Sequence, residues 1–404
     1  MLKKLSEISF LLLVFSLPFA NLPIPFDPGF PFQITEPIFL AASALLALSV
    51  LSGGRNIRGG KIYFFIAAYL VFIAVSVCFS EVQRVSAVKA AGIAYLGALT
   101  LLSFNCVEGK RMIRQSVLAW IAATVAVSAF SVLVLILFYV DRDLSIVRYG
   151  LSHYGTFPPG NYPRIQSLFA NPNMLAHYLG IGWVLLLVAK RKEWIPPALF
   201  AVSAGIVAIA AIFTLSPGLG VFFLGTGLWM LLVEKAGGVR KAAAAGMIAI
   251  ALLFVVVTAV RFDKNFAPVA EPSARVLTWS SAASNFVAHP LTGKGVGTFA
   301  ADAAYGSQRL RDAHNLFLNV AAESGIGAVA AITVFGVWLT VSGFRGRRRG
   351  EQGAVVGKGL AIAFAGAFFY QGLAGSFEDA RHLWVLAGML AAVSVESKGE
   401  AADE

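Results

Sequence analysis

The stretch IYFFIAAYLVFIAVSVCFS, residues 62–80, decides the class of fold. It contains no charged residue, and as a helix it is long enough to cross the roughly 30 Å hydrocarbon core of a bilayer. Similar apolar stretches recur along the whole chain, at residues 8–23, 33–52, 62–80, 88–106, 115–140, 172–189, 196–214, 217–234, 242–260, 315–342, 359–376 and 383–396. The sequence therefore predicts an all-α polytopic integral membrane protein with about 12 transmembrane helices, in a single transmembrane domain over residues 1–404.

The distribution of charge predicts the topology. Apolar residues make up 58% of the chain and charged residues 13%, and the formal net charge is +11. If the N-terminus is cytoplasmic, every inner segment is basic, as the positive-inside rule requires. The inner basic residues are Lys3, Lys4, Arg55, Arg58, Lys61, Lys110, Arg111, Arg114, Lys190, Arg191, Lys192, Lys235, Arg240, Lys241, Arg345, Arg347, Arg348, Arg349, Lys358 and Lys398. We therefore expect both termini in the cytoplasm and no nucleic-acid partner.

The first residues permit two interpretations. Lys3 and Lys4, followed by an apolar stretch that ends near Ala20, resemble a signal peptide, but the run of further spans favours an uncleaved first helix. Cys78 and Cys106 fall near opposite ends of successive spans, so the sequence predicts neither a disulfide nor a metal pair.

Two outer segments are long. Residues 141–171 are rich in proline and glycine, which predicts an ordered loop across the outer face. In residues 261–314 we expect a helix over residues 273–287 capped by Ser273, then a glycine-rich turn, then a shorter amphipathic piece at about 300–312.

The stretch RIQSLFANPN, residues 164–173, leads into the sixth span. Asn171 as the helix N-cap and Pro172 in the first helical position explain part of it. These two capping roles do not account for Arg164, Ser167 and Phe169 together, so a functional role of these three residues stays open.

The stretch GKGVG, residues 293–297, superficially resembles a nucleotide-binding loop. Ala288 stands where the first glycine of a P-loop belongs, and Gly295 follows the lysine in place of Ser or Thr. A flexible turn is the simpler interpretation.

Four of the five histidines have ordinary explanations. His177 lies within a span and is expected to be a hydrogen-bonded packing residue, while His153 and His382 are expected in loops. His289 precedes a proline at a helix end, where capping is the default.

His314 differs because it stands where the outer loop re-enters the membrane, beside Asn315. Imidazole accepts a proton near neutral pH without a large pKa shift, so His314 is the candidate general base. Glu323 lies within the tenth span, where a carboxylate is costly unless it is paired, and we expect it to pair with or orient an outer arginine.

At these residues the chain resembles the O-antigen ligase and polymerase superfamily of bacterial surface-polysaccharide assembly. The matching blocks are Arg164-x-x-Ser167-x-Phe169-x-Asn171-Pro172-Asn173-x-x-Ala176, Arg275-x-x-x-Trp279 with His289-Pro290-Leu291-x-Gly293-x-Gly295-x-Gly297-x-Phe299, and His314-Asn315-x-x-Leu318 with Glu323-x-Gly325-Ile-Gly327. With the spans they cover most of residues 8–396.

The resemblance implies a GT-C-like membrane fold in the bacterial inner membrane, with the active site at the periplasmic face and loops 141–171 and 261–314 on that side. It also implies a glycosyltransferase that moves a glycan from an undecaprenyl-diphosphate carrier to an acceptor hydroxyl. For a ligase of lipopolysaccharide biosynthesis the acceptor is lipid A–core, for a polymerase another carrier-linked glycan, and for a protein O-oligosaccharyltransferase a protein hydroxyl. Of these three activities, we expect O-antigen ligation to lipid A–core.

The resemblance and the residue chemistry together give a predicted site. Arginine binds phosphate oxygens bidentately and stays charged, so Arg164 and Arg275 are expected on the diphosphate, with His314 as base, no cofactor and no metal. The expected substrate-binding residues are Arg142, Arg148, Asn171, Asn173, Trp279, Asn315 and Glu323.

One departure from the family pattern concerns Ser216-Pro217-Gly218, where the family usually has Ser-Arg-Gly. Either another outer arginine substitutes, from among Arg142, Arg148, Arg261 and Arg381, or the activity differs. A lipid or polysaccharide transporter is a weaker alternative because the spans hold almost no ionisable residue at mid-depth. A non-catalytic assembly factor, the other alternative, would need no His314 beside arginines.

Overall fold

The computed structural model describes residues 1–19, 33–152, 163–216, 218–261, 274–299, 304–305, 308–309, 312–345, 350–374 and 380–399. Within these residues the chain is almost entirely α-helical, and its β structure consists of two pairs of two-residue strands. His153, Pro217 and Ser273, which were singled out in the sequence, lie outside the described residues.

The helices follow one another along the whole chain. They are α1 (Leu2–Ser16) with the 3₁₀ turn η1 (Leu17–Phe19), α2 (Thr35–Leu51), α3 (Ile62–Cys78), α4 (Gln83–Cys106), α5 (Gly109–Val140), α6 (Ser145–Gly150), α7 (Pro172–Arg191), α8 (Pro197–Phe213), α9 (Leu219–Leu232), α10 (Gly238–Arg261), α11 (Ala274–Ala288), α12 (Leu316–Phe344), α13 (Gly350–Ala374) and α14 (Arg381–Gly399).

A helix therefore lies at every expected span. Among the described residues, five helices are long and apolar enough to cross a membrane: α4, α5, α7, α12 and the Gly353–Gly372 part of α13. Helix α5 begins at Gly109 rather than at 115, because Lys110, Arg111 and Arg114 are good helix formers that continue the helix beyond its apolar part. The chain is thus an all-α protein of membrane type, and the number of crossings stays a prediction.

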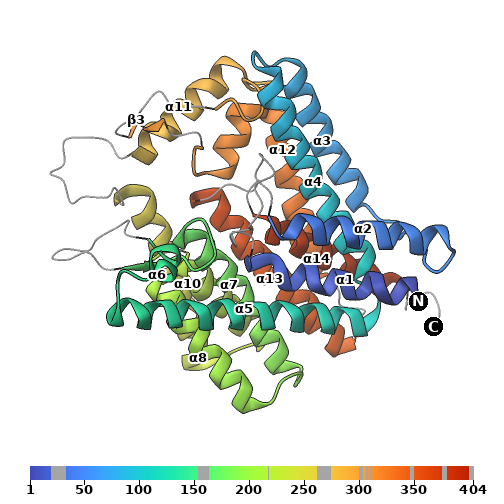
Figure 1. The fold of residues 1–404 in the computed structure, drawn as a ribbon, viewed down its shortest axis with the longest axis vertical. Coiled ribbons are helices and arrows are strands. Elements are labelled where there is room, and N and C mark those ends of the chain that lie inside the picture. The colour runs from blue at the N-terminus through green and yellow to red at the C-terminus, as the bar shows by residue number, and fades with distance from the viewer. Residues whose placement is uncertain are drawn as a thin grey trace.

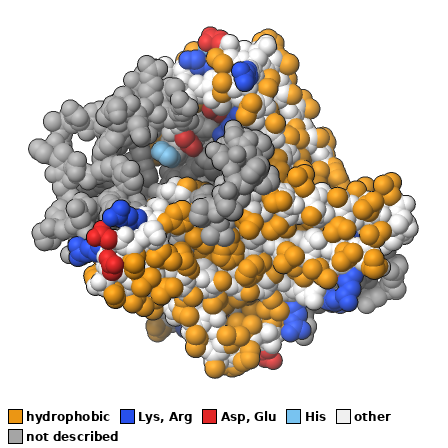
Figure 2. Space-filling model, viewed as in Figure 1, with side chains coloured by type: hydrophobic (Ala, Val, Ile, Leu, Met, Phe, Trp, Pro, Cys, Tyr) orange, Lys and Arg blue, Asp and Glu red, His pale blue; other side chains and the backbone are white. Residues whose placement is uncertain are grey.

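The helices pack around α7, α13 and α14, whose side chains are mostly buried. Helix α13 contacts both α7 and α12, while α14 packs against α4. Helix α5 runs beside α1 on one side and contacts α8 on the other (Figure 1). Figure 2 shows hydrophobic side chains spread over the face formed by α1, α2, α5 and α8, with Lys and Arg side chains at its edges. Such a broad apolar surface is expected of a face in contact with lipid.

Basic residues from the first predicted inner segments meet at one end of the bundle. Glu108, which precedes α5, accepts ion pairs from Lys3 at 3.2 Å and from Arg55 at 3.3 Å. Burial alone would raise the pKa of the Glu108 carboxyl, but these two cations outweigh it and hold that pKa below its ordinary value. Arg58 donates to the carbonyls of Val107 at 2.6 Å and Ala392 at 3.2 Å. These segments therefore lie on the same side.

The described parts of the two long loops contain short antiparallel strands. In the first loop, β1 (Leu151–Ser152) pairs with β2 (Arg164–Ile165), which brings the ends of that loop together. In the second, β3 (Ala304–Tyr305) pairs with β4 (Gln308–Arg309). Within the expected amphipathic piece at 300–312, the described residues 304–305 and 308–309 are therefore extended and paired.

Helix α12 is interrupted at Gly325, where φ is 75° and ψ is −177°. The break leaves main-chain carbonyls without the hydrogen bonds that they would accept from the next turn of an unbroken helix. The N–H of Lys294 donates to the Ala322 carbonyl at 2.9 Å, and that of Gly295 donates to the Glu323 carbonyl at 3.0 Å. The glycine-rich segment 289–299 therefore completes the hydrogen bonding of α12, as a broken membrane helix requires.

Further hydrogen bonds join segment 289–299 to α12 beyond the break and to α3. The N–H of Ile326 donates to the Pro290 carbonyl at 2.9 Å. Ser76 of α3 donates its hydroxyl to the Glu323 carbonyl at 2.6 Å and accepts from the N–H of Val296 at 3.0 Å. The segment is a turn, as the sequence predicted, but it is bonded to two helices rather than flexible.

The two main chains approach so closely that only glycine fits. A Cβ at Gly293 would lie 2.1 Å from the carbonyl carbon of Glu323, and one at Gly325 would lie 2.2 Å from the carbonyl oxygen of Leu291. Both glycines also have a positive φ, of 66° and 75°.

We predict that Gly325→Ala destabilises the protein by about 3 kcal/mol or more, because it adds a backbone clash to a strained φ. Gly92→Ala in α4 is the matched control, since a Cβ there meets nothing within 4 Å. It should be neutral or slightly stabilising. Thermal unfolding of both variants in detergent measures the difference, and equal melting temperatures would contradict the interlock.

Candidate functional site

The N-terminal end of α7 is capped as the sequence predicted. The side-chain oxygen of Asn171 accepts the N–H of Met174 at 2.9 Å, and Pro172 takes the first helical position. This confirms the capping interpretation of Asn171, which satisfies one of the free N–H groups of the first turn.

Arg164, in β2, is held by one group that follows α8 and by one group in the first turn of α7. Its Nε donates to the Thr214 carbonyl, after α8, at 2.9 Å, and its Nη2 donates to the Asn173 side-chain oxygen at 3.1 Å. Ser216 donates to the same Asn173 oxygen at 2.8 Å. Arg164 as a whole is half-buried, and these contacts orient its guanidinium.

Ser167 and Phe169, which the cap did not explain, hold the chain between β2 and α7. Ser167 is buried with φ at 53°, and its N–H donates to the Gly150 carbonyl at 2.9 Å. The Phe169 ring packs against Tyr178 and His382, with centroids 5.5 and 6.4 Å away. Both side chains are therefore buried in the segment between β2 and α7.

The turn before α12 presents an exposed histidine. His314 has φ at 49°, and its N–H donates to the Asp312 carboxylate at 2.6 Å. Asn315 is the N-cap of α12, since its side chain accepts the N–H of Leu318 at 3.1 Å. Asn315 thus supplies the cap, and His314 beside it is exposed.

Helix α11 fixes this turn through an aromatic side chain. The indole N–H of Trp279 donates to the Ala313 carbonyl at 3.0 Å. The helix itself agrees with the one expected at residues 273–287. Arg275 lies in its first turn, and its side chain is not among those described.

Helix α13 brings the two helix ends together. Its Ala367 carbonyl lies 3.1 Å from His177 of α7, and Gln371 also faces that histidine. One residue further, a Cβ at Gly372 would lie 2.5 Å from the ring of Phe317, in the first turn of α12. The N-terminal ends of α7 and α12 therefore flank the C-terminal turns of α13. We call these two ends the outer site, with Arg164, Asn173, Trp279 and His314 as its described side chains.

Glu323 lies deeper in α12 and is buried. Its carboxylate accepts the N–H of Phe299 at 3.2 Å, at the end of the glycine-rich segment. The described contact therefore ties the carboxylate to the segment that completes the break in α12.

The arginines considered as substitutes at Pro217 differ in their surroundings. Arg142 lies over the Phe138 ring at 4.9 Å, and Arg148 pairs with Asp143 at 2.8 Å on an exposed surface. Arg381 is partly buried and pairs with Glu36 at 2.9 Å. The side chain of Arg261, the last residue of α10, is not among those described.

His382 was expected in a loop, and that prediction was wrong. It is the second residue of α14, buried, and its Nε2 lies 2.7 Å from Nδ1 of His177. His177 is buried and hydrogen-bonded, as expected for a packing residue. Only the fold brings these distant positions together, so no local sequence signal could have shown the pair.

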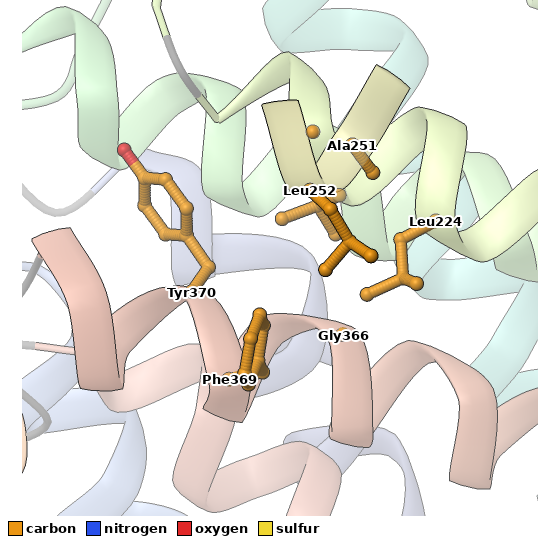
Figure 3. A pocket seen from close by; sticks show the side chains of 8 residues that line it. Leu224, Ala251, Leu252, Gly366, Phe369 and Tyr370 are labelled. Carbon is orange, nitrogen blue, oxygen red and sulfur yellow. The ribbon is translucent and has the colours of Figure 1, made fainter. Parts of the chain in front are cut away.

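A small apolar pocket of about 20 Å³ lies between α9, α10 and α13 (Figure 3). Leu224, Leu252 and Phe369 line it, and Tyr370 extends from it toward α7, where its ring stacks on His177. Its volume is about that of one water molecule, which is too little for a substrate. Within the part of the chain that the structure describes, no three His, Cys, Asp or Glu side chains are grouped to hold a metal ion.

Comparisons of the chain with known protein families and with curated proteins give no match.

The two capping asparagines were expected to bind substrate, and a substitution pair at Asn315 tests how much its capping bond contributes to stability. We predict that Asn315→Ala lowers the free energy of unfolding by about 1 kcal/mol, whereas Asn315→Ser, whose hydroxyl caps equally well, does not. Chemical or thermal unfolding in detergent measures both. A serine variant as unstable as the alanine variant would show that the amide makes another essential contact.

Proposed function

We propose that the protein is a glycosyltransferase that moves a glycan from an undecaprenyl-diphosphate carrier to an acceptor hydroxyl at the outer site. The observation that carries this proposal is that an oriented, half-buried arginine and an exposed histidine lie at two helix ends that flank the same helix, α13. The resemblance of the same residues to the O-antigen ligase and polymerase superfamily supports it independently of the geometry.

Arg164 would bind the diphosphate of the donor. A guanidinium forms two parallel hydrogen bonds to phosphate oxygens, and each charge-assisted bond contributes about 1.5–3 kcal/mol. Because Asn173 and the Thr214 carbonyl already orient the guanidinium, little reorganisation is needed when charge develops on the leaving diphosphate. Arg275 is proposed as the second arginine on the strength of its motif, and Arg142 or Arg148 as a further contact.

His314 would act as the general base. The acceptor oxygen attacks the anomeric carbon as the bond from that carbon to the diphosphate oxygen breaks. The hydroxyl proton passes to the imidazole, and undecaprenyl diphosphate leaves. This direct displacement inverts the anomeric centre, and the arginine charges stabilise the leaving group without a metal.

The proposed orientation in the membrane is supported by the basic end of the bundle. Helix α5 begins at Gly109, beside the cluster of Lys3, Arg55 and Glu108, and ends at Val140, next to α6. With that cluster cytoplasmic, the outer site would face the periplasm of a bacterial inner membrane and both termini the cytoplasm. A donor could then reach the site with its polyprenyl tail in the surrounding lipid.

The experiment that tests this function is transfer by the purified protein in detergent. Carrier-linked glycan is supplied with either lipid A–core or carrier-linked glycan as acceptor. We expect lipid A–core to be extended, which identifies a ligase, while chain growth on the carrier would identify a polymerase and transfer to a protein hydroxyl a protein O-oligosaccharyltransferase. Failure with every acceptor would contradict the proposal.

The same assay tests the base. His314→Ala should reduce single-turnover transfer by roughly 10²-fold or more, because a general base contributes about 10²–10⁴ in rate. Its melting temperature should stay close to that of the wild type, since Asn315 supplies the cap. His289→Ala, at an exposed histidine after α11, is the matched control and should transfer normally. Undiminished transfer by a folded His314→Ala protein would remove this residue from the mechanism.

A further inference from the structure

Two buried histidines join α7 to α14 near the N-terminal ends of both helices. His177 is the sixth residue of α7 and His382 the second of α14, and their ring nitrogens are 2.7 Å apart. Both side chains are almost completely enclosed. The pair therefore lies inside the bundle and cannot itself touch a substrate.

The hydrogen-bond pattern fixes which nitrogen carries each proton. The Ala367 carbonyl of α13 can only accept, so the Nε2 of His177, at 3.1 Å, must donate to it. In a neutral imidazole the Nδ1 of His177 then accepts, and the Nε2–H of His382 is its donor. One continuous chain of hydrogen bonds thus connects α14, α7 and α13.

Packing alone does not explain these residues. Apolar side chains could fill the space without the cost of enclosing polar groups away from water. A hydrogen bond depends on the angle between donor and acceptor, whereas a contact between two leucines does not. The histidine pair can therefore restrict the rotation of one helix against the next. The rings of Tyr178 and Tyr370 enclose the pair and restrict its movement further.

The pair is directly connected to the outer site. Asn173 precedes His177 by four residues and therefore lies on the same face of α7, one turn nearer the helix end. Asn173 and Thr214 both hold the Arg164 guanidinium. On the other side, His382 follows Arg381, which is paired with Glu36 of α2. A rotation of α7 would carry Asn173, and hence Arg164, away from its present position.

We propose that His177 and His382 are positioning residues, whose mutual hydrogen bond holds α7 at the rotation in which Arg164 binds the carrier diphosphate. The inference rests on the function proposed above and extends it to residues that touch neither substrate. Loss of the hydrogen bond between the two histidines should therefore weaken binding of the donor and leave binding of the acceptor unchanged.

The test compares two substitutions in the full-length protein. His382→Phe keeps an aromatic ring against Tyr178 but loses the donor, while His382→Gln keeps an N–H that can reach His177. We expect the phenylalanine variant to raise the donor KM about 10-fold or more, since small displacements of binding groups have effects of this size. The acceptor KM should not change, and the glutamine variant should have a donor KM close to that of the wild type.

Trp183→Phe supplies the matched control. It removes another side-chain hydrogen bond from α7, from the Trp183 indole to Thr226 of α9 at 2.9 Å, further from the outer site. A structural tie of this kind should lower the melting temperature and leave the donor KM unchanged. If the His382→Phe protein does not fold, His382→Asn, whose shorter amide cannot reach His177, takes its place.

Binding of undecaprenyl diphosphate alone, measured as a ligand-induced shift in melting temperature, separates the two proposals. A wild type that binds the carrier, and a His382→Phe variant that does not, support the positioning role whatever the transfer assay gives. A His382→Phe variant with the wild-type donor KM and carrier binding overturns it, as does a glutamine variant impaired as strongly as phenylalanine. A wild type that neither binds the carrier nor transfers glycan overturns the proposed function and this inference together.

Discussion

The break in α12 is the constraint on which the rest of the outer site depends. In a lipid environment each main-chain N–H and C=O must find a partner within the protein, so a helix can open only where another segment replaces the lost bonds. Segment 289–299 does so at Gly325, and Gly293 allows the two backbones to approach. The segment is thereby fixed, and with it the end of α11, whose Trp279 holds the turn that carries His314.

The same logic governs the end of α7. Asn171 satisfies its first turn, which leaves Asn173 available to orient Arg164. Each of the two helix ends thus has its own capping asparagine. The residues proposed to act on the substrate, Arg164 and His314, lie next to these caps. Helix α13 sets the distance between the two ends, because its last turns contact both. The proposed chemistry needs such a fixed frame, since an arginine and a base act together only at a constant separation.

Much of this could be predicted from the sequence because it is local. Runs of apolar residues predicted a helix at each span, and the described residues have one there, while the pair Asn171-Pro172 marked a helix start through its own side chains. The interlock of Gly293 with α12 and the contact of His177 with His382 could not be predicted, since each joins segments that only the packed helices bring together. Helix α13 begins at Gly350 instead of 359 for a simpler reason: helix formation continues beyond the apolar stretch that marks the span.

We propose that the ends of α7 and α12 form one site for a polyprenyl diphosphate. Photolabelling tests it most directly, with a polyprenyl diphosphate that carries a photoreactive group next to its phosphates, followed by identification of the labelled peptides. We expect labels in residues 163–174 and 312–318, both suppressed by excess unlabelled carrier. Labelling confined to the opposite end of the bundle, around Lys3, Arg55 and Glu108, would contradict it.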